Sequence, residues 1–136
     1  MPIRPYLNFN GQCEEAFKFY EKCLGGKIVT MMAHEGTPVA KEVPTEWSKK
    51  IMHACLSVEG DLIMGSDAPA AYYKPPQGFS VTLQINDPVK AVSTFNALAE
   101  NGTVQMPIQE TFWAERFGMV VDRFGTPWMI NCEKAA

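Results

Sequence analysis

Short strand-like segments alternate with two helical segments along the chain. The strand-like segments are rich in β-branched and aromatic residues and are bounded by Gly, Pro, Asn or Asp, which is typical of β-strands. Alternation of apolar and polar positions within them indicates sheets with one buried face. We predict strands at residues 3–9, 27–33, 51–58, 61–66, 79–85, 104–110, 117–121 and 127–132.

Two segments show apolar residues at helical spacing instead. The first is followed by Gly25-Gly26, and the second begins with Asn86-Asp87-Pro88, a cap followed by proline at the first helical position. The apolar stripes expected to face the core are Cys13, Phe17, Tyr20 and Leu24 in the first helix and Val89, Val92, Phe95 and Ala99 in the second. The element order β-α-β-β-β therefore occurs twice.

The two halves repeat at an offset of 76 residues. The matching pairs are Phe9 and Ile85, Asn10 and Asn86, Phe19 and Phe95, Gly26 and Gly102, and Ile28 and Val104. We predict an α+β fold of tandem βαβββ modules within a single domain, residues 1–136. Module one covers about residues 1–66, a linker covers 67–78, and module two covers about 79–132.

The last two strands are expected to form a hairpin around the turn Asp122-Arg123-Phe124-Gly125, whose glycine tolerates a positive φ. Successive side chains of a strand point to opposite faces. Pro127, Met129 and Asn131 should therefore share one face of the last strand, and Trp128, Ile130 and Cys132 the other.

Composition narrows the class of protein. The chain has 136 residues and a net charge of −3, without a basic cluster, so nucleic acid is an unfavourable partner. No apolar run reaches the roughly 18 residues of a membrane span, and no signal-peptide core follows Met1. We expect a cytoplasmic protein without a membrane partner. The four cysteines show no CxxC spacing and are expected to be reduced.

A polar, uncharged face is predicted beside Met129. If Met129 faces a cleft, Pro127 and Asn131 face it as well, and if Ser80 does, Thr82 and Gln84 share its face. Ser80, Thr82, Gln84 and Asn131 would then make a polar, uncharged lining that suits hydrogen bonding to a small polar ligand. The same side chains would equally suit the water-facing side of an open sheet. Asn8 on the first strand and Trp113 complete the predicted ligand-binding residues; Trp113 would stack on a planar ligand or pack in a core or dimer interface.

The ionisable candidates are few. His53 shares a strand face with Cys55, a spacing that fits a metal fragment or a Cys-His pair, and also an ordinary structural histidine. Asp67 ends the fourth strand, where it is a candidate catalytic base or a turn cap. His34 opens a long inserted loop and is expected to form a solvated pair with Glu35.

Three segments carry a resemblance to a known family. They are PYLNFNGQCEEAFKFYEKCLGGK at the start, KKIMHACLSVEGDLIMGSDA in the middle and QETFWAERFGMVVDRFGTPWMIN at the end. Together they resemble the PhnB-like branch of the vicinal oxygen chelate superfamily, which includes glyoxalase I, bleomycin-resistance proteins and extradiol dioxygenases. The resemblance implies a strongly curved mixed sheet around a cleft, a small-molecule ligand and a homodimer.

The resemblance also implies where a metal would be held. The superfamily's ligand positions fall on Arg4 or Pro5, Met64, Ser80 and Met129, and divalent metals of this class prefer imidazole or carboxylate. We therefore expect neither the usual metal centre nor another cofactor. A methyltransferase label attached to similar proteins has no support here, because no glycine-rich nucleotide-binding turn is present.

Three hypotheses about function follow. The first is metal-independent binding of a small molecule. The second is a metal-dependent lyase, isomerase or dioxygenase-like enzyme that rebuilds a metal site from His53, Asp67, Cys55 or Glu115. The third is a structural dimer module whose cleft is filled by its own side chains.

Overall fold

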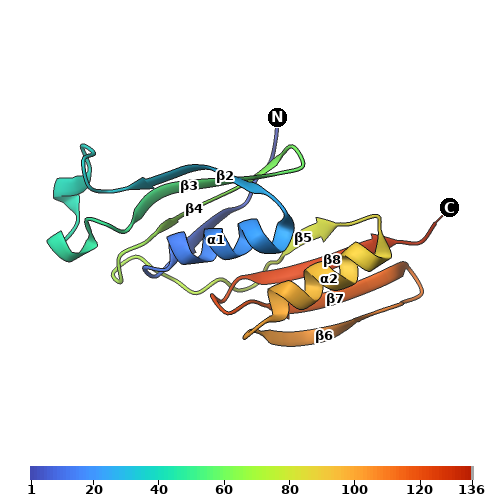
Figure 1. Ribbon diagram of the computed structural model, residues 1–136. Coiled ribbons are helices and arrows are strands. Elements are labelled where there is room, and N and C mark those ends of the chain that lie inside the picture. Colours follow the sequence, from blue (N-terminus) through green and yellow to red (C-terminus); the bar gives the residue numbers. More distant parts are fainter. Residues whose placement is uncertain (136) are drawn as a thin grey trace. The chain divides into compact units, whose positions relative to one another are not determined.

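The computed structural model describes residues 1–135, and the chain divides into two compact units, Met1–Pro75 and Pro76–Ala136. Each unit is a four-stranded mixed sheet with one helix packed on one face (Figure 1). The predicted α+β class and the tandem βαβββ order are confirmed. The division between the units falls inside the predicted linker.

Unit 1 contains the elements β1 (Tyr6–Phe9), α1 (Cys13–Leu24), β2 (Lys27–Ala33), β3 (Ile51–Val58) and β4 (Asp61–Asp67). Its strand order is β1-β4-β3-β2, with β1 parallel to β4 and the other pairs antiparallel. The inserted loop between β2 and β3 carries two 3₁₀ turns, η1 (Ala40–Glu42) and η2 (Thr45–Trp47). His34 is 7% exposed, so the solvated pair expected with Glu35 is wrong. It closes the base of the loop, because both its backbone N–H and its ring Nδ1 lie within hydrogen-bond distance of the Lys50 carbonyl oxygen.

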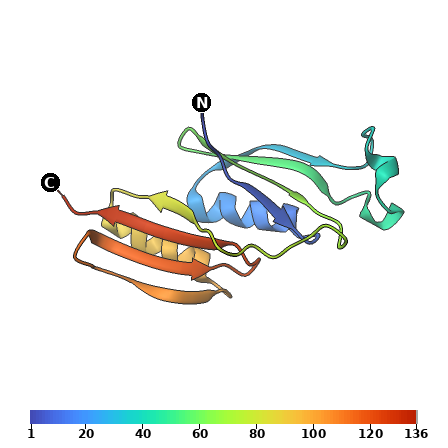
Figure 2. The same cartoon turned by 180° about the vertical axis from the view of Figure 1, so that it is seen from behind.

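Unit 2 contains β5 (Val81–Gln84), α2 (Pro88–Ala99), β6 (Thr103–Gln109), β7 (Ala114–Val121) and β8 (Pro127–Glu133). Its strand order, β5-β8-β7-β6, repeats that of unit 1, and the one parallel pair is again the first strand with the last. Figure 2 shows the face of this sheet that α2 does not cover. The core between helix and sheet includes Trp128, Ile130 and Val120, all fully buried.

The strand pairing agrees with the predicted offset of 76 residues for the first strand of each unit, whereas the last strands, β4 and β8, are offset by 65 residues. Tyr6 pairs with Met64 in unit 1, and Thr82, which lies 76 positions after Tyr6, pairs with Met129 in unit 2. The two glycines after the helices are also equivalent. A Cβ on Gly26 or Gly102 would lie 2.5 Å from a backbone carbonyl oxygen of the neighbouring strand, so only glycine fits there.

The helices depart from this offset. The buried positions Cys13, Ala16, Phe17 and Tyr20 of α1 match Ala91, Thr94, Phe95 and Leu98 of α2, a shift of 78 residues. Phe17 lies against Gly65, whereas Phe95 lies against Gly118. The predicted equivalence of Phe19 with Phe95 is therefore wrong, since Phe19 is only partly buried. A packed helix can slide along a sheet, but hydrogen-bonded strands keep their register.

The predicted stripe of α2 is also corrected. Val89 is 77% exposed, and Val92 and Ala99 are only partly buried, while the residues that face the sheet are Ala91, Thr94, Phe95 and Leu98. Small side chains at 91 and 94 let the helix approach the sheet closely. The start of this helix is as predicted, because the Asp87 side chain accepts a hydrogen bond from the Val89 N–H and Pro88 occupies the first helical position.

The predicted final hairpin is confirmed. Asp122 is buried at the turn, and its Oδ1 accepts hydrogen bonds from the backbone N–H groups of Phe124 and Thr126. Its Oδ2 accepts one from the Trp128 indole N–H at 2.8 Å. Gly125 has φ +93°, as the turn requires. One carboxylate therefore holds the turn and anchors the largest core side chain.

Candidate functional site

The face of the unit 2 sheet opposite α2 carries the candidate site. Trp128, Ile130 and Cys132 point into the core and are at most 1% exposed, whereas Met129 and Asn131 are only partly buried. The alternation predicted for the last strand is therefore confirmed. On β5, Thr82 and Gln84 are exposed on the same face, because they pair in register with Met129 and Asn131.

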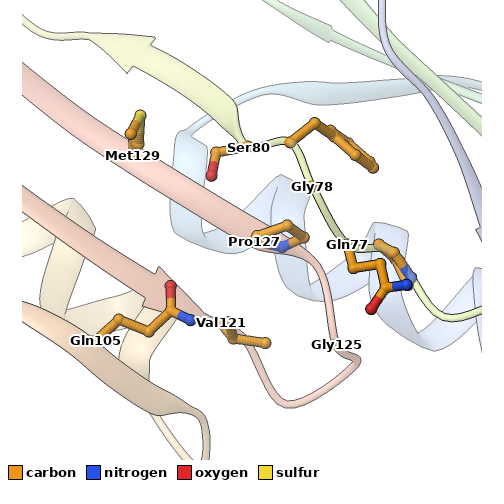
Figure 3. Close-up of a pocket in the computed structure, with 10 residues that line it drawn as sticks. Gln77, Gly78, Ser80, Gln105, Val121, Gly125, Pro127 and Met129 are labelled. Atoms are coloured by element: carbon orange, nitrogen blue, oxygen red, sulfur yellow. The ribbon is translucent and has the colours of Figure 1, made fainter.

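A pocket of about 500 Å³ lies at one end of this face (Figure 3). It is formed by the segment that leads into β5 together with β6, β7, the hairpin turn and β8. Its lining residues are Pro76, Gln77, Gly78, Phe79, Ser80, Gln105, Val121, Gly125, Pro127 and Met129. Two predicted site residues, Ser80 and Met129, are among them.

The chemistry of this pocket is mixed and uncharged. Two carboxamides, from Gln77 and Gln105, and the hydroxyl group of Ser80 supply hydrogen-bond donors and acceptors. The remaining surface comes from backbone and from apolar side chains, including the thioether of Met129. None of the described residues that line the pocket is ionisable, so the pocket can orient a ligand but has no acid or base of its own.

The other predicted residues of unit 2 form a polar strip farther along β5 and β8. Thr82 Oγ1 lies 3.7 Å from the Met129 sulfur, and Asn131 Nδ2 donates to Gln84 Oε1 at 2.9 Å. Gln84 Nε2 in turn donates to Glu133 Oε1 at 3.1 Å. The Asn131 Oδ1 is shielded from solvent and has no hydrogen-bond partner within residues 1–135.

Trp113 lies between β6 and β7 and is 47% exposed. Its ring makes edge contacts with Phe112 at 4.8 Å and with Phe117 at 5.4 Å between ring centroids. Phe117 pairs in register with Asn131, so this aromatic group adjoins the polar strip and lies apart from the lining of the pocket.

Asn8 and His53 lie on unit 1. Asn8 is exposed on β1 and pairs with Ser66 of β4. The Nδ1 atom of His53 lies 3.2 Å from the hydroxyl oxygen of Tyr6, and the two rings stack with centroids 5.8 Å apart. This pair places an imidazole and a phenol in hydrogen-bond contact on the face that α1 does not cover.

Asp67 is 4% exposed, and both of its carboxylate oxygens accept backbone hydrogen bonds. Oδ1 accepts from the Cys13 N–H at the start of α1, and Oδ2 accepts from the Ile51 N–H at the start of β3, each at 2.9 Å. The carboxylate thus joins three elements of unit 1. Its negative charge also interacts favourably with the positive N-terminal end of the α1 dipole.

The two buried thiols Cys13 and Cys132 are poorly suited to nucleophilic chemistry. Burial raises the pKa of the Cys13 thiol, and the nearby carboxylates of Asp67 and Glu14 raise it further. Burial likewise raises the pKa of Cys132, with a further contribution from Glu115. Both thiols therefore stay protonated near neutral pH, and the thiolate is the reactive form.

The donor set does not fit the metal centre that the resemblance implies. Met64 and Met129 occupy equivalent positions in the two units, and thioether sulfur is a poor ligand for hard or borderline divalent ions. Within the described chain, no three side chains of His, Cys, Asp or Glu gather as a metal-binding group. Within unit 1, His53, Cys55 and Asp67 form no such group.

Sequence reasoning missed much of the pocket. Gln77 was assigned to a linker, Gln105 to an unremarkable strand, and Phe79 and Val121 to strands without a site. The linker's three prolines and single glycine were the only available signal that it had a defined path. Neither helix in the described part of the chain is long and apolar enough to cross a membrane.

Two tandem βαβββ units with helix-free sheet faces define the glyoxalase/bleomycin-resistance class of fold. A glyoxalase/bleomycin resistance protein/dioxygenase family enzyme from Burkholderia phytofirmans PsJN has this fold at a TM-score of 0.66 and 12% identity, with 96% of this chain and 97% of that chain covered. The chain belongs to the family described as 3-demethylubiquinone-9 3-methyltransferase, which it matches over residues 2–131.

Relatives cover nearly the whole chain. Protein YjdN of Escherichia coli (strain K12) is 35% identical over 142 residues, with 98% of this chain and 97% of YjdN covered. The crystal structure of protein PA1353 from Pseudomonas aeruginosa has a TM-score of 0.90 and 46% identity, with 99% of both chains covered. A Bacillus cereus protein named putative 3-demethylubiquinone-9 3-methyltransferase, PhnB protein, has a TM-score of 0.76 and 23% identity, with 97% and 99% covered.

Proposed function

We propose that this chain binds a small molecule without a metal ion, and that the ligand occupies the pocket of unit 2. The observation that carries the proposal is the lining of that pocket. It combines hydroxyl and carboxamide groups with apolar surface in a volume of about 500 Å³, which is the usual composition and size of a ligand site.

The donor chemistry supports binding over metal catalysis. The equivalent positions Met64 and Met129 offer thioethers where metal-dependent relatives of this fold would offer imidazole or carboxylate. The methyl-transfer reaction in the family's description is not proposed for this chain. Each unit has a single parallel strand pair, and the parallel βαβ nucleotide-binding arrangement that a methyl donor would use does not occur in the described chain.

A ligand screen tests this proposal directly. A metabolite and antibiotic panel would be added to ¹⁵N-labelled protein, and the amide signals of Ser80, Val121 and Met129 would be followed by NMR. We expect at least one compound to shift these three signals together. A panel that shifts none of them, or that shifts only signals of unit 1, would contradict the assignment of this pocket.

A pair of variants identifies the place of binding. Ser80→Phe puts a bulky ring into the pocket and should weaken binding of the screening hit at least tenfold. Ser93→Phe makes the same change at an exposed position of α2, outside the pocket, and should leave the affinity unchanged. Equal effects of the two substitutions would show that the hit binds elsewhere.

The second candidate function is an enzyme, and the contact of Tyr6 with His53 is the observation that favours it. A hydrogen-bonded phenol and imidazole on an open sheet face can exchange a proton with a bound substrate. If His53 is the base, His53→Gln abolishes any detected turnover while leaving the ligand affinity of the unit 2 pocket intact. Turnover that survives this substitution would remove the candidate.

The third element of the proposal is a homodimer, which the resemblance to the superfamily favours. Size-exclusion chromatography with light scattering measures the mass of the protein in solution, which can be compared with 15.1 kDa for one chain. A mass near twice that value is expected. A monomeric mass across the micromolar range would contradict this part of the proposal and leave the pocket of unit 2 unaffected.

A further inference from the structure

We infer that the unit 2 pocket takes an uncharged ring compound that carries an amide or hydroxyl group. The inference rests on the proposed binding function and specifies the class of its ligand. It depends on three properties of the lining, namely the absence of charge, the type of polar group and the nature of the apolar walls.

The absence of charge excludes ionic recognition. None of the described lining residues is ionisable. A carboxylate, phosphate or ammonium group that entered would give up part of its hydration without a counter-ion, which is unfavourable. The group that enters the pocket is therefore neutral.

The polar groups of the pocket match a ligand that both donates and accepts hydrogen bonds. Gln77 and Gln105 each present two N–H donors and one carbonyl acceptor, and the Ser80 hydroxyl group can act in either sense. Amides and hydroxyl groups have the same dual character, whereas ethers and ketones only accept. Figure 3 shows Gln77 and Ser80 on the segment leading into β5 and Gln105 on β6, so the polar groups come from two sides of the pocket.

The apolar walls favour a ring. Phe79 supplies an aromatic face and is 51% exposed, and Met129 adds a polarisable sulfur of the kind that packs well on aromatic edges. Pro127 and Val121 form rigid apolar surface on the adjacent strands β8 and β7. A flat ring makes more contact with such walls than a flexible chain does, and loses less conformational entropy on binding.

A matched trio of probes tests the inference. Benzamide, benzoate and benzylamine share one ring and differ in charge at neutral pH. Each would be titrated into ¹⁵N-labelled full-length protein in about 150 mM salt, which screens the attraction of the protein's net charge of −3 for the cation. We expect benzamide to shift the signals of Ser80 and Met129 with a Kd at least tenfold lower than either charged analogue.

A charge introduced into the lining should reverse this order. Gln105→Glu replaces a carboxamide by a carboxylate of the same shape at an exposed position of β6, so the fold is retained. The affinity for benzamide should fall about tenfold and that for benzylamine should rise. Gln109→Glu makes the same change on the same strand outside the pocket and should alter neither affinity.

Two results would overturn the inference. Tighter binding of benzoate or benzylamine at the pocket signals would show that the site selects a charged ligand, while the proposed binding function would stand. If no member of the trio and no compound of the wider panel shifts the pocket signals, both the inference and the proposed function fail.

Discussion

At the scale of single residues, two buried carboxylates organise the two units. Asp67 accepts hydrogen bonds from backbone N–H groups at the starts of α1 and β3. Asp122 accepts hydrogen bonds from backbone N–H groups of the hairpin turn and from the Trp128 indole N–H. Each side chain satisfies several backbone or side-chain donors that would otherwise be buried without a partner, which is costly.

The role of Asp67 leads to a stability prediction. Asp67→Ala leaves the N–H groups of Cys13 and Ile51 without their acceptor and should lower the free energy of unfolding by about 2 to 4 kcal/mol. Asp67→Asn should cause a smaller loss of stability than Asp67→Ala, because its amide oxygen can still accept one hydrogen bond while its amide nitrogen cannot accept the other. Urea unfolding measures both, with Asp61→Ala at the exposed start of β4 as the control, expected within about 0.5 kcal/mol of the wild type. If Asp67→Ala is as stable as the wild type, the Asp67 carboxylate does not have this structural role.

The buried thiols provide a second prediction. Because burial raises the pKa values of Cys13 and Cys132, iodoacetamide should label the partly exposed Cys23 first and reach these two only after unfolding. Peptide mass spectrometry reads the order of labelling.

The same shifts in thiol pKa make the stability of the fold depend on pH. Above about pH 8.5 the thiols of the unfolded chain lose their protons while the folded thiols keep theirs, so stability should fall as pH rises past that point. Substituting Cys13 by alanine should reduce this pH dependence, whatever its effect on stability at neutral pH. A slope that is unchanged in the variant would show that Cys13 does not contribute.

At the scale of elements, the side-chain cap at the start of α2 tests how much a local sequence signal contributes to stability. Asp87→Ala removes the hydrogen bond to the Val89 N–H and should destabilise the protein by about 1 kcal/mol, whereas Asp87→Ser should restore most of the loss. Urea unfolding of the three proteins measures the difference. If serine is no better than alanine, the side-chain cap is not the source of the effect.

Local signals predicted the elements well and the packing of α2 poorly. The bounds of α1, β2 and β3 agree with the pattern, as does the turn at Asp122, because periodicity, caps and glycine act within a few residues. The apolar stripe of α2 was wrong, because the pattern favoured valine over alanine and threonine, although the close approach of helix and sheet selects small side chains at Ala91 and Thr94.

At the scale of the whole molecule, the absence of a suitable donor set predicts a protein without a metal centre. Protein purified without an affinity tag should contain well under one equivalent of transition metal per chain, measured by elemental analysis. Addition of Zn²⁺, Ni²⁺ or Mn²⁺ should leave the Tm unchanged, since Met64 and Met129 offer thioether donors only. A stoichiometric metal with a raised Tm would contradict the prediction and favour an enzyme.

The site was partly predictable from the sequence. Ser80 and Met129 were predicted because the resemblance assigns superfamily ligand positions to them, and alternation along each strand then added Thr82, Gln84 and Asn131 to the same face. Gln77 and Gln105 were not, since nothing in their local sequence indicates that the segment before β5 and the strand β6 meet at one pocket. That proximity depends on the pairing of β6 with β7 and of β7 with β8, which connects distant segments.

The chain's local patterns thus specify two βαβββ units, the faces of their strands and the hairpin turn, because each depends on residues close in sequence. Tertiary structure decided which helix positions are buried, that both Asp67 oxygens serve backbone groups, and which polar residues share the pocket with Met129. These features depend on contacts between residues far apart in the sequence, and such contacts form only when sheets pair and helices pack.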